Sequence, residues 1–278
     1  MVVSDKLRAQ FASWLPLMEK FITSPEMDKI FAFLKSESSK GKVVLPESKN
    51  VFKSFELCPR DSVRTVIYMM DPYPTKSKDN VIIADGVPLS CKNTGKLQPS
   101  LEFWYMKLEQ EYKGFDTDMD YRPDCSYLLR EEGVLLLNSS LTVELQKSGS
   151  HQEIWMEFQK YFIEEILNKF FSGLPIVLCG AQSQRLEKYI NPLIHHIHKT
   201  SHPASVAHSG GTFWNTDMFK WIDNILQANN GQKIRWIRNK GESTEPMPEW
   251  VTKSMYQKSQ VNEDEVLSDL PWGKNNRK

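Results

Sequence analysis

Polar or turn-forming residues follow four short apolar runs in this sequence. Asp71 directly follows the run 64–70, and Asn138 follows 133–137. Gly180 follows 175–179, and His202 follows 197–201. Taken singly, Asp71, Asn138 and Gly180 are ordinary turn formers, and a lone His-Pro pair usually has no special meaning. If the runs are parallel strands of one sheet, however, all four residues meet at the edge where such sheets bind ligands. The pattern therefore predicts a site that combines an acid, an amide, a glycine turn and a histidine.

The elements that must position these residues can also be predicted. Near-continuous apolar runs separated by helical stretches are typical of a parallel sheet that is buried on both faces. Helices are expected at 100–112, 150–171 and 182–190, with two more within 5–38. Ser150 and Glu153 form a capping-box pattern, which predicts that the second of these helices begins there. We therefore expect an α/β fold with three αβα layers around a central four-stranded, mostly parallel sheet.

The composition excludes several classes of protein. The 278 residues include 35 Lys and Arg against 35 Asp and Glu, so the formal net charge is zero. This balance argues against a polycationic coat of nucleic acid, although a local basic patch can exist within a neutral total. We find no signal-peptide pattern and no apolar run long enough to span a bilayer. We therefore expect an intracellular, cytoplasmic protein that is not associated with a membrane.

Neither the cysteines nor the clustered histidines predict a metal site. The four cysteines, at 58, 91, 125 and 179, are scattered without a CxxC pair, so we expect free thiols. His195, His196 and His198 lie close together but have no acidic or cysteine residue nearby to complete a ligand set. We expect no metal.

A series of motifs, in order, resembles that of the family 1 uracil-DNA glycosylases. The motifs are VFKSF at 51–55, MDPYP at 70–74, ADG at 84–86, QPSL at 98–101, GVLLLNSSLTV at 133–143, SH at 150–151 with Trp155 and Phe158, VLCG at 177–180 and HP at 202–203. The resemblance runs from about residue 14 to residue 236, and the block at 133–143 is highly specific. It implies a glycosylase domain over 1–240. The polar segment 241–278 would then be a tail, either disordered or docking through its aromatic residues.

The resemblance implies a monofunctional DNA glycosylase without a cofactor. Such an enzyme flips a pyrimidine, here most simply uracil, out of single- or double-stranded DNA and hydrolyses its N-glycosidic bond to leave an abasic site. By resemblance, Asp71 stabilises the sugar cation and orients the attacking water, and His202 donates to the departing base. Asn138 reads the base edge, while Tyr73 stands against carbon 5 and excludes thymine. The resemblance further implies that the protein acts as a monomer.

Four positions depart from the pattern of the family. Met70 replaces a glutamine before the catalytic acid, and Pro74 replaces a histidine after the tyrosine. Asp85 replaces a histidine, and we expect its carboxylate to repel a nearby phosphate. Leu89 aligns with the phenylalanine that stacks on uracil, so base binding loses a contact worth about 1–3 kcal/mol or the pocket is reshaped.

The residues expected to grip DNA match the family less closely. Pro99 and Ser100 fit its proline-rich loop, where a hydroxyl and a helix start can hold a phosphate. The Gly-Ser turn of the family reads Gly180-Ala181 here, so one hydroxyl is missing. The remaining DNA-binding residues are expected in the loop after the histidine: Ser205, His208, and Val206 as the wedge that fills the space of the flipped base.

Three functions stay open at this point. The first is uracil excision with a divergent pocket. The second is removal of a modified pyrimidine, such as hypermodified cytosine in phage DNA, which would serve antiviral defence. Because an amide presents either an oxygen or an NH2 group, Asn138 does not exclude this. The third is a weakly active DNA-binding or partner-docking module, against which the joint presence of Asp71, Asn138 and His202 argues.

The formal net charge of zero is the sum of regions with opposite charge. Residues 181–240 contain eight Lys or Arg and three acids, for a net charge of +5, whereas residues 101–132 contain four bases and nine acids, for −5. The inferred DNA-binding loops lie in the first region. The sequence therefore predicts a polarised surface with salt-sensitive affinity for DNA.

Overall fold

Four parallel strands form the centre of the molecule. The computed structural model describes residues 5–112, 119–205, 211–229 and 231–239. The strand order is β4–β2–β6–β7, and the strands are β2 (Thr65–Met69), β4 (Val134–Asn138), β6 (Pro175–Cys179) and β7 (His196–Thr200). Each predicted run is thus confirmed as a strand to within one residue at either end.

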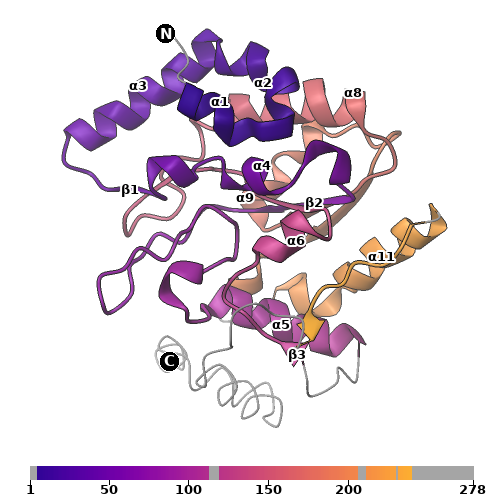
Figure 1. The fold of residues 1–278 in the computed structure, drawn as a ribbon. Helices are drawn as coiled ribbons and strands as arrows, with labels where there is room; N and C mark the ends of the chain where they lie inside the picture. The colour runs from indigo at the N-terminus through magenta and orange to yellow at the C-terminus, as the bar shows by residue number, and fades with distance from the viewer. Residues whose placement is uncertain (1–4, 113–118, 206–210, 230, 240–278) are drawn as a thin grey trace.

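Helices cover both faces of this sheet, which confirms the predicted three-layer α/β fold (Figure 1). On one side lie α1 (Asp5–Phe11), α2 (Leu15–Ile22), α3 (Pro25–Ser39) and α8 (Asn168–Phe170); on the other lie α5 (Pro99–Tyr112) and α11 (Met218–Ala228). Shorter helices are α4 (Lys53–Leu57), α6 (Ser126–Arg130) and α9 (Ala181–Gln184). Two small antiparallel pairs join β1 (Val44–Leu45) to β5 (Val143–Glu144), and β3 (Met119–Asp120) to β8 (Arg238–Asn239).

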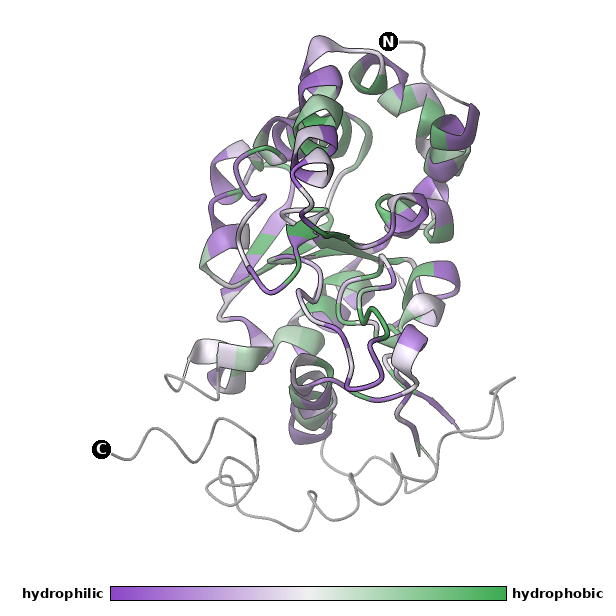
Figure 2. Ribbon diagram, turned by 90° about the vertical axis from the view of Figure 1, so that its left-hand side faces the viewer, coloured by the Kyte–Doolittle hydropathy of each residue, from purple (hydrophilic) through white to green (hydrophobic). Residues whose placement is uncertain are grey.

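Burial explains why three of the strands read as continuous apolar runs. Every residue of β2, β4 and β6 is buried, because these strands have helices on both faces. Strand β7 lies at the edge of the sheet and leaves His196 and Lys199 exposed, which accounts for its weaker apolar pattern. Figure 2 shows the same contrast, with apolar residues gathered at the sheet and hydrophilic residues on the outer helices.

An aromatic cluster packs in each helical layer. In the first, Trp14 and Phe55 meet edge to face with ring centroids 5.6 Å apart, and the indole Nε1 of Trp14 donates to the carbonyl of Cys58 at 2.8 Å. In the second, Trp104 and Phe219 meet edge to face at 4.7 Å. Such pairs add about 0.5–1.5 kcal/mol beyond the burial of apolar area. All four cysteines are buried free thiols, as predicted.

The predicted helix at 150–171 begins later than its capping pattern indicated. Helix α7 (Met156–Tyr161) continues through π-helical turns at Phe162–Leu167 into α8, and no side chain caps its first turn. The hydroxyl of Ser150 instead accepts the backbone N–H of Glu144 at 2.8 Å, and Glu153 pairs with Arg185 at 2.6 Å. The capping-box prediction is therefore wrong, because partners outside the helix take both side chains. The predicted helix at 182–190 is likewise broken, into α9 and a 3-10 turn at Glu187–Tyr189.

Strand register brings the polar residues to one edge. Met69 is paired with Asn138, and Cys179 with Thr200, so the carboxyl ends of all four strands are level. Within the described residues, no helix is both long and apolar enough to cross a membrane. The predicted tail at 241–278 lies outside the described residues.

Candidate active site

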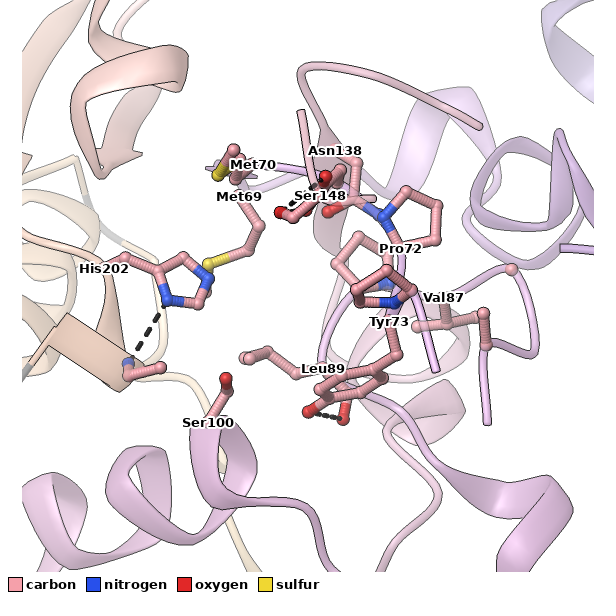
Figure 3. Close-up of a pocket in the computed structure, with 16 residues that line it drawn as sticks. Met69, Met70, Pro72, Tyr73, Val87, Leu89, Ser100, Asn138, Ser148 and His202 are labelled. Carbon is pink, nitrogen blue, oxygen red and sulfur yellow. Dashed lines mark hydrogen bonds between the residues drawn. The ribbon is translucent and has the colours of Figure 1, made fainter. Parts of the chain in front are cut away.

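A cavity of about 260 Å³ lies at the carboxyl ends of β2, β4 and β7 (Figure 3). It is lined by all six residues that the sequence predicted for catalysis and base binding, namely Met70, Asp71, Tyr73, Leu89, Asn138 and His202. Figure 3 shows His202 on one side of the cavity and Tyr73 with Pro72 on the other. Strand ends that are up to 131 positions apart in the sequence thus build one site.

Asp71 is held by a loop that the sequence did not single out. Its Oδ2 accepts the backbone N–H of Gly149 at 2.6 Å and the hydroxyl of Ser148 at 2.9 Å, and Ser148 also lies 3.2 Å from Oδ1. Burial raises the pKa of Asp71 above its ordinary value, and these hydrogen bonds oppose the rise. The carboxylate therefore combines a fixed orientation with raised basicity.

His202 is a neutral hydrogen-bond donor in this structure. Its Nδ1 accepts the backbone N–H of Ala204 at 3.2 Å, so the ring proton resides on Nε2. Burial lowers the pKa of His202 to about 4, which keeps the ring uncharged at neutral pH. Gly180 makes room for the ring, because a Cβ at this left-handed position (φ +94°) would lie 3.1 Å from the Cβ of His202.

Asn138 presents a buried acceptor without a donor. The residue is 6% exposed, and its Oδ1 has no hydrogen-bond partner among the described residues. The Nε2 of Gln159 donates to the Asn138 carbonyl at 2.9 Å and fixes the backbone behind the amide. Buried acceptors in folded proteins nearly always have a partner. An orphan oxygen at a cavity wall therefore marks a place for a donor on a ligand.

Three donors converge on the Met70 carbonyl and join the ends of β2 and β4. They are the hydroxyl of Ser139 at 2.8 Å, the N–H of Ser140 at 3.0 Å and the Nε2 of Gln152 at 3.1 Å. The backbone on which Asp71 and Asn138 stand is consequently rigid. The side chain of Met70 lines the cavity but has no N–H or O–H to offer.

Leu89 forms a strained part of the cavity wall. It is buried and has a φ of +66°, a left-handed conformation that is uncommon for any residue other than glycine. The hydroxyl of Tyr73 donates to its carbonyl at 3.1 Å. Leu89 gives this wall of the cavity an aliphatic side chain in place of an aromatic ring.

Asp85 is not among the residues that line this cavity, and its repulsion of a nearby phosphate stays a prediction. Its carboxylate accepts the backbone N–H groups of Val87 at 3.0 Å and Lys92 at 3.1 Å, and the hydroxyl of Ser90. These three bonds close the loop that carries Leu89. The replacement of histidine by aspartate thus supplies a tether for the pocket wall.

The predicted DNA-binding residues fall into three groups. Pro99 and Ser100 begin α5, and Ser100 reaches the cavity although it is only 7% exposed. Ala181 is exposed at the start of α9, directly after Gly180. The hydroxyl of Ser205 donates to the His202 carbonyl at 2.7 Å. Val206 and His208 lie outside the described residues.

Four of the seven Lys and Arg residues that the structure describes in segment 181–240 form ion pairs with acids. Arg235 contacts Glu131 at 3.3 Å and Glu132 at 3.2 Å, and Arg238 also pairs with Glu131. Two further ion pairs join Arg185 to Glu153 at 2.6 Å and Lys199 to Glu187 at 2.9 Å. Of these ion pairs, only those of Arg235 and Arg238 with Glu131 and Glu132 join the basic segment to the acidic segment 101–132. The polarised surface with salt-sensitive affinity for DNA stays a prediction.

Two of the three clustered histidines, His195 and His198, pack within the fold, whereas His196 is exposed. His195 is buried and its Nε2 lies 3.2 Å from the Leu167 carbonyl, while the ring of His198 packs on Trp221 at 5.0 Å. In the part of the chain that the structure describes, no three His, Cys, Asp or Glu side chains gather to hold a metal ion.

Sequence reasoning missed the residues that support the site, chiefly Ser148, Gly149, Gln152 and Gln159. Ser148 and Gly149 lie 77 and 78 positions from Asp71, and no local pattern indicates their contact. The available signal was their place in the loop between the 133–143 block and the Ser150-His151 motif, which joins two of the recognised motifs.

Comparisons with known proteins agree with this geometry. No protein-family model matches the chain. The chain is similar to the uracil-DNA glycosylase of Caenorhabditis elegans, with 31% identity over 81% of this chain and 76% of that protein. It is also similar to the uracil-DNA glycosylase of Pseudomonas paraeruginosa, with 32% identity over 84% of this chain and 96% of that protein. In fold it is similar to the crystal structure of mimivirus uracil-DNA glycosylase, with a TM-score of 0.73 and 22% identity over 84% of this chain and 89% of that chain.

Proposed function

The chain belongs to the uracil-DNA glycosylases, and from this we propose how its cavity acts on DNA. Members of this family are hydrolases of N-glycosidic bonds, and DNA is their substrate. We propose that the domain formed by residues 1–240 acts as a monomer, receives a flipped pyrimidine in the cavity and leaves an abasic site. The base that we propose is uracil.

The orphan Oδ1 of Asn138 is the observation that carries this proposal. Uracil offers an N3–H group that can donate to this oxygen and a neighbouring O4 that can accept from the amide nitrogen. A ligand without a matching donor would leave the acceptor buried and unpaired, which costs about 1–3 kcal/mol. The cavity therefore selects for an edge that carries a donor beside an acceptor.

Asp71 and His202 complete the proposed chemistry. Breaking the N-glycosidic bond develops positive charge on the sugar and negative charge on the departing base. The Asp71 carboxylate stabilises the sugar cation and orients the water that attacks it. The Nε2–H of neutral His202 donates to the base oxygen on which negative charge grows, an oxyanion-type contact worth roughly 3–4 kcal/mol.

Two further features define the class of reaction. No lysine is among the residues that line the cavity, so hydrolysis proceeds without a Schiff base. Tyr73 would stand against carbon 5 of the pyrimidine and exclude the methyl group of thymine.

The proposed contacts to the phosphate backbone on either side of the flipped nucleotide come from Pro99, Ser100, Gly180, Ala181 and Ser205. Val206 would be the wedge, with His208 beside it.

Leu89 favours one second candidate, a glycosylase for a modified pyrimidine. Without an aromatic ring at this position, residue 89 cannot stack on uracil. The amino group of a cytosine also provides a donor for Asn138. Any bulky substituent on carbon 5 would have to pass Tyr73.

A direct assay distinguishes these functions. The purified chain is incubated with single- and double-stranded oligonucleotides that contain uracil, cytosine, thymine or hypermodified cytosine, and abasic sites are then cleaved with alkali. Strand breaks at uracil alone support the proposal, and breaks only in the modified DNA support the second candidate. Breaks in no substrate would indicate a DNA-binding module without this activity. The Asp71→Asn variant serves as the matched control for a contaminating glycosylase.

A further inference from the structure

We propose that Ser148 is a positioning residue whose hydroxyl holds the Asp71 carboxylate in the orientation that hydrolysis requires. This inference rests on the proposed function, because it assigns Asp71 to the attacking water. It concerns a residue in the loop between β5 and α7 rather than in a strand-end motif. Ser148 lines the same cavity as Asp71 and is exposed at its mouth.

The contacts to the two carboxylate oxygens are unequal. Oδ2 of Asp71 has two donors, the N–H of Gly149 at 2.6 Å and the Ser148 hydroxyl at 2.9 Å, whereas Oδ1 has only the longer 3.2 Å contact to Ser148. A hydroxyl has one proton, so Ser148 donates to one oxygen at a time and favours the nearer one. Oδ1 is consequently the oxygen left to accept a hydrogen bond from water.

The loop that carries Ser148 is fastened on both sides of this contact. Before it, the N–H of Gln146 donates to the carbonyl of Pro74 at 2.6 Å; after it, Gly149 reaches Asp71 itself. The hydroxyl of Ser150 accepts the N–H of Glu144 at 2.8 Å and closes the loop on β5. Ser148 is therefore held against the segment 71–74 rather than meeting it by chance.

The side chains next to Asp71 in the sequence and the hydroxyl of Ser139 do not replace this donor. Met70, Pro72 and Pro74 have no side-chain N–H or O–H group, and the hydroxyl of Ser139 is already directed to the Met70 carbonyl at 2.8 Å. In the described part of the chain, the hydrogen bonds to the Asp71 carboxylate come from Ser148 and Gly149. Only the first comes from a side chain, so substitution can remove it.

A hydrogen bond to the charged form of a carboxylate lowers its pKa, so losing Ser148 should raise the pKa of Asp71. The other titratable groups among the residues that line the cavity are Tyr73 and His202. Burial raises the pKa of Tyr73, which stays uncharged, and His202 is neutral above about pH 4. On the loop itself, Lys147 and Glu144 lie 3.8 Å apart and offset one another. A change in the titration of Asp71 is therefore attributable to the lost hydroxyl.

The test compares Ser148→Ala and Ser148→Thr in the full chain, each with aspartate or asparagine at position 71. Ser148→Ala should lower the single-turnover rate of uracil excision at pH 7 about tenfold, without changing the affinity for DNA. It should also move the acid limb of the pH profile to higher pH. Ser148→Thr keeps the hydroxyl and should restore both. In the Asp71→Asn background, Ser148→Ala should cause no further loss. An equal loss in that background would overturn the proposal.

A second measurement does not depend on activity. The pKa of the Asp71 carboxyl is followed by 13C NMR titration in the wild type, in Ser148→Ala and in Ser150→Ala, which removes a bond of the same loop without contacting Asp71. We expect a higher pKa in Ser148→Ala and no shift in Ser150→Ala. An unchanged pKa in Ser148→Ala would refute the positioning role even in an active enzyme. A shifted pKa in a protein that excises no uracil would refute the proposed function instead.

Discussion

The hydroxyl of Tyr73 donates to the backbone carbonyl of Leu89 at 3.1 Å, which couples two walls of the cavity. Tyr73 belongs to the motif that resembles the family, and Leu89 is the departure from it. The tyrosine thus fixes a leucine whose φ of +66° is itself strained. Strain of this kind persists where surrounding contacts determine the backbone, and here the Asp85 tether and Tyr73 supply them.

Replacing Leu89 with phenylalanine should increase uracil excision. Base–aromatic stacking is worth about 1–3 kcal/mol, so kcat/KM should rise about tenfold. Leu89→Met is the matched control, because methionine has a similar volume and no aromatic ring. It must also adopt the same left-handed backbone conformation. Steady-state kinetics on uracil-containing DNA measure the effect. Equal or slower excision by Leu89→Phe would show that the cavity is shaped for another base.

Asp71→Asn and His202→Ala should each reduce turnover by on the order of a hundredfold. Asn at position 71 cannot carry the charge that stabilises the sugar cation, and Ala at position 202 removes the Nε2–H donor. Single-turnover rates measure both effects, and thermal unfolding shows whether the fold is retained. Full activity in either folded variant would refute the assigned role.

The rate of excision should fall in acid and stay level as the pH rises from 6 to 8. Asp71 acts as a carboxylate, and its pKa lies above the ordinary value, so activity is lost as the pH falls through that raised pKa. His202 has a pKa of about 4 and acts as the neutral ring, so its protonation state does not change between pH 6 and 8. A single-turnover pH profile checks both limbs. A fall in the excision rate as the pH rises from 6 to 7 would instead indicate that His202 acts as an imidazolium.

Gly86→Ala should destabilise the protein strongly because of where Gly86 lies. Gly86 lines the cavity with a φ of +97°, and a Cβ there would lie 2.1 Å from the carbonyl oxygen of Asn50. Gly41→Ala is the control, since Gly41 has a φ of +78° with no atom within 4 Å of the added Cβ.

In urea unfolding, we expect Gly41→Ala to lose about 1 kcal/mol from the backbone conformation alone. Gly86→Ala should lose roughly 2–4 kcal/mol, because the backbone of Asn50 must also move. Similar losses of unfolding free energy in the two variants would show that the backbone around Gly86 can move apart without further destabilisation.

The sequence by itself determined the sheet and the placement of its chemical groups. The runs that end before Asp71, Asn138, Gly180 and His202 form the four strands, and the first three are continuously apolar because a strand buried on both faces needs an unbroken apolar run. Parallel strands end at the same edge, so these residues had to meet. The order of motifs also identified the family before the geometry was known.

Tertiary structure alone decided how those groups are oriented and supported. The contact of Ser148 with Asp71, the bonds of the Asp85 carboxylate within its own loop and the use of Ser150 by β5 rather than by a helix all give side chains partners that helix or strand spacing does not predict. The same is true of the ion pairs between Glu131 and Arg235. Local periodicity reports which face of an element is buried, but polar side chains bond to whichever partner the completed fold brings within about 3 Å. No spacing along the chain encodes that choice.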